Sequence, residues 1–316
     1  MISNANPTWP ASQAAYRVRA WHLSPFRWLK RSAAWSVMAA LVYCAVCGYL
    51  WGWQDQLIFF PDPVINLSPE DYGLPYQEVR LPVKNATNGR DEIHGWWIPA
   101  RSGPTKVLLY LHGNSGNIGS YLPHAVRFHH LGFSVLLVDY RGYGESRGDH
   151  PSESRMYEDA DAAWNYLIGR GLNPGQVFIY GHSLGGAVAV ELASRHSRAA
   201  GLIVEGTFTS MSDIVQWGGQ YRIFPVDWLL RQRFDSIRKI RSLKLPMLFI
   251  HGTADRKIPY QMSERLYAAA ISMHKRLVLI PEGDHSNSAR VRRPLYVQTV
   301  QEFAEKTLGN ALYAAN

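Results

Sequence analysis

The sequence is poor in cysteine, with only Cys44 and Cys47 among its 316 residues. So few cysteines exclude a small domain held together by disulfide bonds. The nucleotide-binding pattern G-x-x-x-x-G-K-[ST] and the zinc-peptidase pattern H-E-x-x-H are both missing, so neither chemistry has support. Charged residues make up 18% of the chain and hydrophobic residues 47%, which excludes an intrinsically disordered protein.

Acidic residues are absent from residues 1–54, although this segment holds five of the 33 Lys and Arg residues. The other 28 stand against 25 Asp and Glu, so most of the net charge of +8 belongs to the N-terminal segment. A nucleic-acid-binding protein needs a concentrated basic face. The rest of the chain shows none, and we expect no nucleic-acid partner.

An uncharged run, AAWSVMAALVYCAVCGYLWGW, occupies residues 33–53. As a helix it would be about 32 Å long, enough to cross the hydrocarbon core of a bilayer. Trp51 and Trp53 at its end are typical of the aromatic belt at a membrane surface. The run is therefore predicted to be an uncleaved single-pass signal-anchor. The positive-inside rule places the basic segment 1–32 in the cytoplasm and the rest of the chain, from residue 55, on the periplasmic, lumenal or extracellular side.

Other interpretations of this segment are a cleaved signal peptide, a lipoprotein acceptor at Cys44, an organelle transit peptide and a buried core helix. The basic lead of some 30 residues is long for a signal peptide, and no small-x-small site follows the run. Tyr43 is too large for the position before a lipoprotein cysteine. A transit peptide does not explain the apolar run, and the run lacks the amphipathic period of a helix packed on a core.

From residue 76 onward, strand-like apolar runs alternate with helical ones, which predicts an α/β domain over residues 55–316. Strands are predicted at residues 77–83, 92–98, 106–112, 133–140, 176–181, 201–206, 246–252 and 276–283, with a turn at 85–89. Helices are predicted at residues 118–131, 153–169, 184–196, 261–271 and 292–307. This order indicates a mainly parallel sheet covered by helices on both faces, with the chemistry at the carboxyl ends of the strands.

About 40 residues without a clear strand, residues 207–244, separate two of these strands and are rich in aromatic side chains. A segment of this length is predicted to form a cap over a binding pocket. The alternative is a helical excursion that packs on the sheet.

The sequence Gly181-His182-Ser183-Leu184-Gly185 lies between a predicted strand and a predicted helix. This is the G-x-S-x-G pattern of a nucleophile elbow, in which the serine occupies a sharp turn and exposes its hydroxyl. Side chains two residues before and after the serine would collide in such a turn, which explains the glycines. Ser183 is therefore the predicted nucleophile.

A serine hydroxyl needs a base, and His285 follows the last predicted strand. The other histidines are less well placed, although they stay possible. Asp255, after the strand 246–252, is predicted to orient the imidazole, because the chain order Ser–Asp–His is the one expected for this fold. Glu205, at the end of the preceding strand, is the rival for this role.

Backbone N–H groups are expected to stabilise the oxyanion that forms during acyl transfer. One should belong to Leu184, the residue after the nucleophile. The other is assigned to Asn114 in the loop His112–Asn117, with Ser115 as the alternative. No metal or cofactor is expected.

These residues resemble the α/β-hydrolase superfamily, and within it the membrane-anchored serine hydrolases, which include acyl-protein thioesterases. The matching pieces are QLIFFP, GWWIPA, LYLHGNSGNIG, DYRGYGESRG, IYGHSLGG, RFDSIRKI, LFIHGTADRKIP and EGDHS, within residues 55–310. The resemblance implies hydrolysis of an ester, thioester or amide through an acyl-enzyme, without a cofactor, and a small-molecule or lipid-like acyl substrate.

Three other interpretations compete with an esterase or thioesterase. An aminopeptidase-like amide hydrolase would use the same residues, and a non-catalytic binding scaffold would keep the fold without the chemistry. A dinucleotide site at residues 139–148 has the wrong glycine spacing, G-x-G-x-x-x-G, and follows an earlier complete strand.

Overall fold

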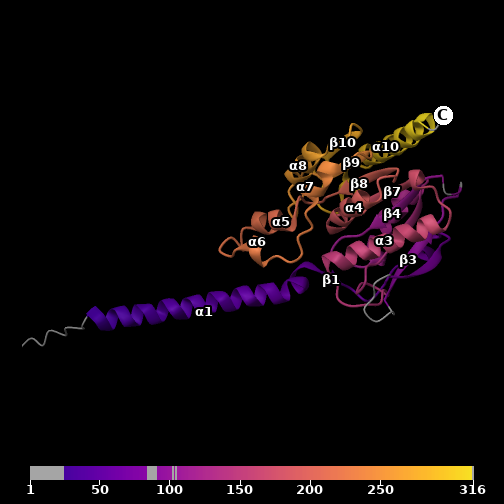
Figure 1. Cartoon of the computed structure of the whole chain (residues 1–316). Coiled ribbons are helices and arrows are strands. Elements are labelled where there is room, and N and C mark those ends of the chain that lie inside the picture. The colour runs from indigo at the N-terminus through magenta and orange to yellow at the C-terminus, as the bar shows by residue number, and fades with distance from the viewer. Residues whose placement is uncertain (1–24, 84–90, 102, 104, 315–316) are drawn as a thin grey trace, which may run out of the picture. The chain divides into compact units, whose positions relative to one another are not determined.

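The computed structural model describes residues 25–83, 91–101, 103 and 105–314. The turn predicted at residues 85–89 and most of the basic segment 1–32 lie outside the described residues. Contacts divide the chain into two units, residues 1–48 and residues 49–316. The second unit holds the α/β domain shown in Figure 1.

One sheet of eight strands forms the centre of the second unit, with the strand order β10-β9-β8-β7-β4-β6-β3-β2. Its members are β2 (Gln77–Pro82), β3 (Glu92–Ile98), β4 (Val107–Leu111), β6 (Ser134–Val138), β7 (Val177–His182), β8 (Gly201–Glu205), β9 (Met247–Gly252) and β10 (Lys275–Ile280). Among these strands the pairs β2–β3 and β3–β6 are antiparallel, and the other five pairs are parallel. The predicted mainly parallel sheet is thus confirmed, and every predicted strand is present within a few residues of its expected bounds.

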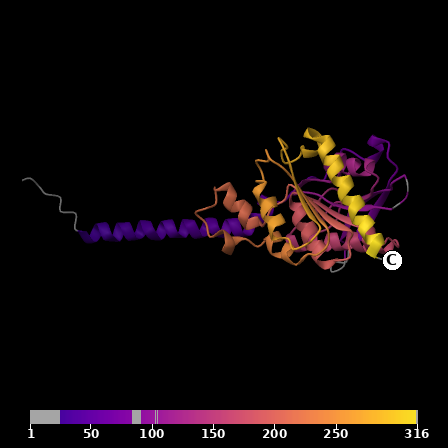
Figure 2. The same cartoon turned by 90° about the horizontal axis from the view of Figure 1, so that it is seen from above.

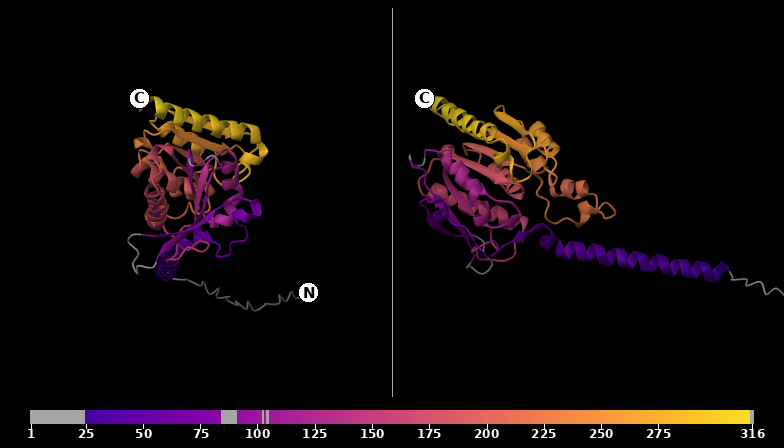
Figure 3. Two further views of the ribbon diagram at one scale, coloured as in Figure 1. Left: turned by 90° about the vertical axis from the view of Figure 1, so that its right-hand side faces the viewer. Right: turned by 180° about the vertical axis from the view of Figure 1, so that it is seen from behind.

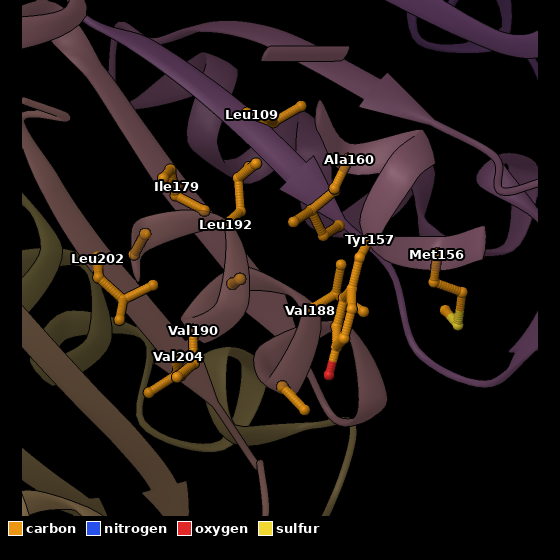
Figure 4. Packing of buried hydrophobic residues seen from close by; sticks show 14 of the residues in the cluster. Leu109, Met156, Tyr157, Ala160, Ile179, Val188, Val190, Leu192, Leu202 and Val204 are labelled. Atoms are coloured by element: carbon orange, nitrogen blue, oxygen red, sulfur yellow. The ribbon is translucent and has the colours of Figure 1, made fainter. Parts of the chain in front are cut away.

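Helices cover both faces of the sheet, and the strand residues alternate between two cores. One face carries α3 (Glu153–Gly169), α4 (Leu184–Arg195) and α8 (Gln261–Ala269), and the other carries α2 (Ile118–His130) and α10 (Arg293–Ala314). Figures 2 and 3 show α10 lying along the outside of the domain. In β4, Leu109 faces the α3–α4 core, whereas Tyr110 faces the α2–α10 core. Figure 4 shows Leu109 and Leu192 of α4 among the side chains of this first core.

The N-terminal helix is longer than the predicted span of residues 33–53. α1 runs over Pro25–Ile58, and within it Trp28–Ile58 is long and apolar enough to cross a membrane. The last ten residues of α1, from Tyr49, belong to the unit that holds the sheet. A small second sheet, β1 (Phe60–Pro61) paired with β5 (Ser115–Gly116), follows α1 and was not predicted.

The segment 207–244, which we call the cap segment, forms short helices that pack in two separate groups. α5 (Met211–Gly218) packs on α6 (Val226–Leu229), and both project from the body of the domain in Figures 1 and 3. α7 (Ser236–Lys239), followed by η3 (Ile240–Ser242), packs against α4 and α8. The remaining short helices are η1 (Pro69–Tyr72), η2 (Pro174–Gln176) and α9 (Ser288–Val291).

The loop after β6 is held by a buried arginine. The Arg141 guanidinium donates to Asp159 (2.6 Å), Asp91 (3.2 Å) and Glu158 (2.6 Å), and only 3% of its side chain is exposed. Removing one member of a buried charge cluster leaves the others uncompensated, which typically costs 3–5 kcal/mol. Arg141→Met is therefore expected to lower the free energy of unfolding by about 3–5 kcal/mol in chemical denaturation.

The matched control is Arg147→Met, because Arg147 lies in the same loop with 74% of its side chain exposed. Its ion pair is screened by solvent, so we expect a change below about 1 kcal/mol. Equal losses in the two variants would contradict the structural role assigned to Arg141.

Candidate active site

Ser183 lies in a strained turn between β7 and α4. Its φ is +55° and its ψ is −122°, a conformation that side-chain-bearing residues rarely adopt. Such strain costs on the order of 1–3 kcal/mol and persists only where the surroundings enforce it. Here the Ser183 N–H donates to the Glu205 carbonyl, and the Thr207 hydroxyl donates to the Ser183 carbonyl.

The two glycines of the G-x-S-x-G pattern are required by backbone packing. A Cβ on Gly181 would lie 2.2 Å from the Gly185 carbonyl oxygen, and one on Gly185 would lie 2.2 Å from the Leu111 carbonyl oxygen. Neither obstacle is a flexible side chain, so no other residue fits without moving the sheet or helix. Both glycines thus allow α4 to approach β4 and β7 closely.

Three side chains that are far apart in the sequence form one hydrogen-bonded chain. His285 Nε2 lies 3.0 Å from Ser183 Oγ, and His285 Nδ1 lies 2.7 Å from Asp255 Oδ2. Their main chains follow β7, β9 and β10, at the carboxyl edge of the sheet. This arrangement can pass the serine proton to the imidazole while the carboxylate holds the ring in the required tautomer.

Asp255 is held as a carboxylate by several donors. Its Oδ1 accepts from the N–H groups of Lys257 (2.8 Å) and Ile258 (2.9 Å). Burial opposes its ionisation, but hydrogen bonds from His251 and His285 outweigh that effect and hold the pKa of Asp255 well below its usual range. Asp255 is therefore charged at every pH at which the protein would work.

The contact from His251 is one that the sequence analysis missed. His251 Nε2 lies 3.2 Å from Asp255 Oδ2, and its Nδ1 lies 2.7 Å from the Ser263 hydroxyl. The only available signal was the i,i+4 spacing of His251 and Asp255. This spacing predicts neighbouring side chains in a helix, but not across the end of a strand and the loop that follows it.

Glu205, the rival to Asp255, is engaged elsewhere. Its Oε2 accepts hydrogen bonds from the hydroxyls of Tyr180 and Tyr296, each at 2.7 Å, on the face of the sheet covered by α2 and α10. Asp284, next to His285 in the chain, accepts instead from the backbone of Ser286. Neither carboxylate forms a hydrogen bond with the His285 ring.

The loop after β4 passes directly over Ser183. A Cβ on Gly113 would lie 3.3 Å from Ser183 Cβ. The Asn114 carbonyl accepts from Tyr143 Oη (2.8 Å), and its side-chain amide donates to the Ile58 carbonyl. The predicted oxyanion role of Asn114 therefore rests on its main-chain N–H. Leu184 is the first residue of α4, where N–H groups have no acceptor within the helix.

A cavity of about 400 Å³ lies beside Ser183 and His285. Its walls are mostly apolar and come from the end of α1, from the cap segment and from the loop after β4. Apolar lining residues include Leu50, Leu57, Ile58, Ile214, Val215 and Phe224. A cavity of this size and lining suits an apolar ligand group next to the reactive hydroxyl.

No group of three or more His, Cys, Asp or Glu residues that could hold a metal ion occurs among the described residues.

His182, the residue before the serine, is buried and bridges to the neighbouring loop, because its Nε2 lies 2.8 Å from the His285 carbonyl oxygen. Burial, with a smaller effect of the nearby His285, lowers the pKa of His182 to about 4. The unfolded chain, with a histidine pKa near 6.5, therefore binds the extra proton first as the pH falls. This lowers the free energy of unfolding between about pH 6.5 and pH 4, and the effect levels off below pH 4.

His182→Gln is expected to remove that contribution, because glutamine can still donate to the His285 carbonyl but does not titrate. The slope of unfolding free energy against pH between pH 6.5 and 4 should fall by about 1.4 kcal/mol per pH unit. Chemical denaturation across this range measures it. The exposed His130 provides the control variant His130→Gln, which should keep the wild-type slope. An unchanged slope in His182→Gln would show that His182 is not held neutral by burial.

The chain is similar to known proteins over most of its length. The sequence model of the family described as serine aminopeptidase, S33, matches residues 102–235 and 230–287. An uncharacterised protein of Mycobacterium tuberculosis is 35% identical over 283 residues, which cover 88% of this chain and 98% of that protein. An Arabidopsis thaliana protein, α/β-hydrolase domain-containing protein WAV2, is 28% identical over 80% of this chain and 88% of its own.

Among solved structures, the esterase Pf2001 of Pyrococcus furiosus has a similar fold. Its TM-score is 0.66 at 20% identity, over 79% of this chain and 99% of the esterase. At that identity the similarity concerns the fold alone.

Proposed function

Because the chain belongs to the α/β-hydrolase superfamily, in the family described as serine aminopeptidase, S33, we propose that it is a membrane-anchored serine hydrolase of carboxylic esters or thioesters. The observation that carries this proposal is the hydrogen-bonded chain Asp255–His285–Ser183 beside a mostly apolar cavity. Membership of this family makes the chain a hydrolase. We further propose Ser183 as the nucleophile, an ester or thioester bond as the one cleaved, and the membrane as the location.

In the proposed reaction, Ser183 Oγ attacks the acyl carbonyl while His285 Nε2 takes the hydroxyl proton. The carbonyl oxygen becomes an oxyanion, which the N–H groups of Leu184 and Asn114 stabilise. When the tetrahedral intermediate collapses, the bond from the acyl carbon to the alcohol oxygen or thiol sulfur breaks. His285 gives its proton to that leaving group.

The second half repeats these steps with water. Water loses a proton to His285 and attacks the acyl-enzyme, and the Ser183–acyl bond breaks as the serine recovers the proton. This second half releases the carboxylic acid and regenerates the free enzyme, and neither half requires a cofactor.

The N-terminal helix α1 supports the membrane location, since Trp28–Ile58 could either anchor the protein or act as a signal sequence. We favour an anchor because the basic segment is long for a signal peptide and no small-x-small site follows the apolar run. The basic residues that precede the span favour a catalytic domain on the periplasmic, lumenal or extracellular side.

The family description favours one second candidate, an amide hydrolase of the aminopeptidase kind. A panel of acyl esters, acyl thioesters and aminoacyl amides, assayed with the full-length chain in detergent, separates the two. We expect kcat/KM to be higher on the esters or thioesters, because the cavity is apolar. Turnover of the amides alone would establish the second candidate.

A further inference from the structure

The end of α1 is part of the cavity that holds Ser183. Four of its residues, Leu50, Gln54, Leu57 and Ile58, line that cavity. Their spacing of i, i+4, i+7 and i+8 places them on one face of the helix. All four belong to the same compact unit as the sheet, so this wall is part of the α/β domain.

Polar contacts join this end of α1 to the cap segment. The buried Gln54 side chain donates to the Leu229 carbonyl (3.2 Å) and accepts from the Arg231 N–H (2.8 Å). The Asp55 carboxylate accepts from the Arg231 guanidinium (2.9 Å) and from the Gln232 side chain (2.8 Å). The apolar walls on either side of the cavity are therefore held together by the helix that also carries the candidate membrane span.

Large apolar side chains surround this junction. Trp51 and Trp53 of α1 are about half exposed, and Trp228 of the cap segment is 90% exposed. Tryptophan prefers the boundary between hydrocarbon and water. Leu50 and Trp53 are three residues apart, which is about 5 Å along a helix. With α1 as a membrane anchor, these tryptophans would put the cavity wall near the surface of the bilayer.

We propose that residues 50–58 of α1 form the acyl-chain wall of this pocket, so that the substrate is an ester or thioester with a long alkyl chain that resides in the membrane. This inference rests on the proposed function. An alkyl chain has no polar groups that need hydrogen-bond partners in an apolar cavity. Each methylene buried there should therefore raise kcat/KM about fourfold. α1 then serves both to place the enzyme at its substrate and to bind the chain of that substrate.

The test compares p-nitrophenyl acetate with p-nitrophenyl dodecanoate, using the full-length chain in phospholipid nanodiscs. The wild-type protein should show the higher kcat/KM on dodecanoate. Leu57→Trp fills part of the cavity and should lower the ratio of kcat/KM on dodecanoate to kcat/KM on acetate roughly tenfold or more. Leu50→Trp, on the same helix face, should do the same. Circular dichroism and thermal unfolding show whether each variant is folded.

Gln56→Trp is the matched control, because Gln56 is exposed, neighbours Leu57 and does not line the cavity. Its kcat/KM on both esters should equal the wild-type values. Equal effects of the Leu50 and Leu57 variants on the two esters, or faster acetate turnover by the wild type, would overturn the acyl-chain wall alone. If the wild type hydrolyses neither ester and a fluorophosphonate does not label Ser183, the proposed function itself fails, and this inference fails with it.

Discussion

Ser183→Ala is expected to lower kcat for ester hydrolysis by about 10⁶-fold. The variant has no oxygen that can form the acyl-enzyme, and His285 loses the hydroxyl that lies 3.0 Å from its Nε2. Any remaining rate would come from water attack assisted by the oxyanion donors. The measurements are initial rates with the purified full-length chain and mass-spectrometric detection of a fluorophosphonate adduct, which should form on the wild type and not on the variant.

Ser194→Ala provides the control, because Ser194 is an exposed serine on α4, the helix that follows the nucleophile. Its hydroxyl donates to the Glu191 carbonyl and contacts nothing in the site. This variant should keep both the rate and the adduct. A Ser183→Ala protein that still hydrolyses esters at near wild-type rates would exclude Ser183 as the nucleophile.

Asp255→Asn is expected to lower kcat by roughly 10⁴-fold. The Asp255 carboxylate lies 2.7 Å from His285 Nδ1, so it selects the tautomer that leaves Nε2 free to accept the serine proton. An amide can present an N–H to Nδ1 instead, which favours the wrong tautomer, and it cannot stabilise the imidazolium. Because the pKa of Asp255 is well below its usual range, the wild type has this carboxylate charged at neutral and mildly acidic pH, where kcat of the two proteins is compared.

Two other carboxylates near the site serve as comparisons. Asp284→Asn changes the residue next to His285 in the chain, but its carboxylate accepts only from backbone N–H groups there. Glu205→Gln changes the rival acid, whose partners are Tyr180 and Tyr296. Both should lose far less activity than Asp255→Asn. Full activity in Asp255→Asn, together with a large loss in Glu205→Gln, would reverse the assignment of the acid.

Much of the fold follows from local patterns. The apolar runs from residue 106 onward predict parallel strands because those strands are buried on both faces, and the structure confirms all of them. Two features have no such signal. β1 and β5 are two residues long, too short to show an alternating pattern. The helical residues on either side of the apolar run in α1 carry charges, so its full length, Pro25–Ile58, was underestimated.

The sequence by itself determined the class of the fold, the elbow at Ser183 and the candidates for its partners. The pattern of apolar strands and a serine turn flanked by two required glycines are local properties of the sequence. Tertiary structure alone decided which side chains meet. It placed His285, 102 residues from Ser183, within hydrogen-bond distance, turned Glu205 towards two tyrosines, and set His251 against Asp255. It also made the end of α1 a wall of the cavity. Such contacts depend on how elements that are distant in the sequence pack around one sheet, and a local pattern of residues does not predict that packing.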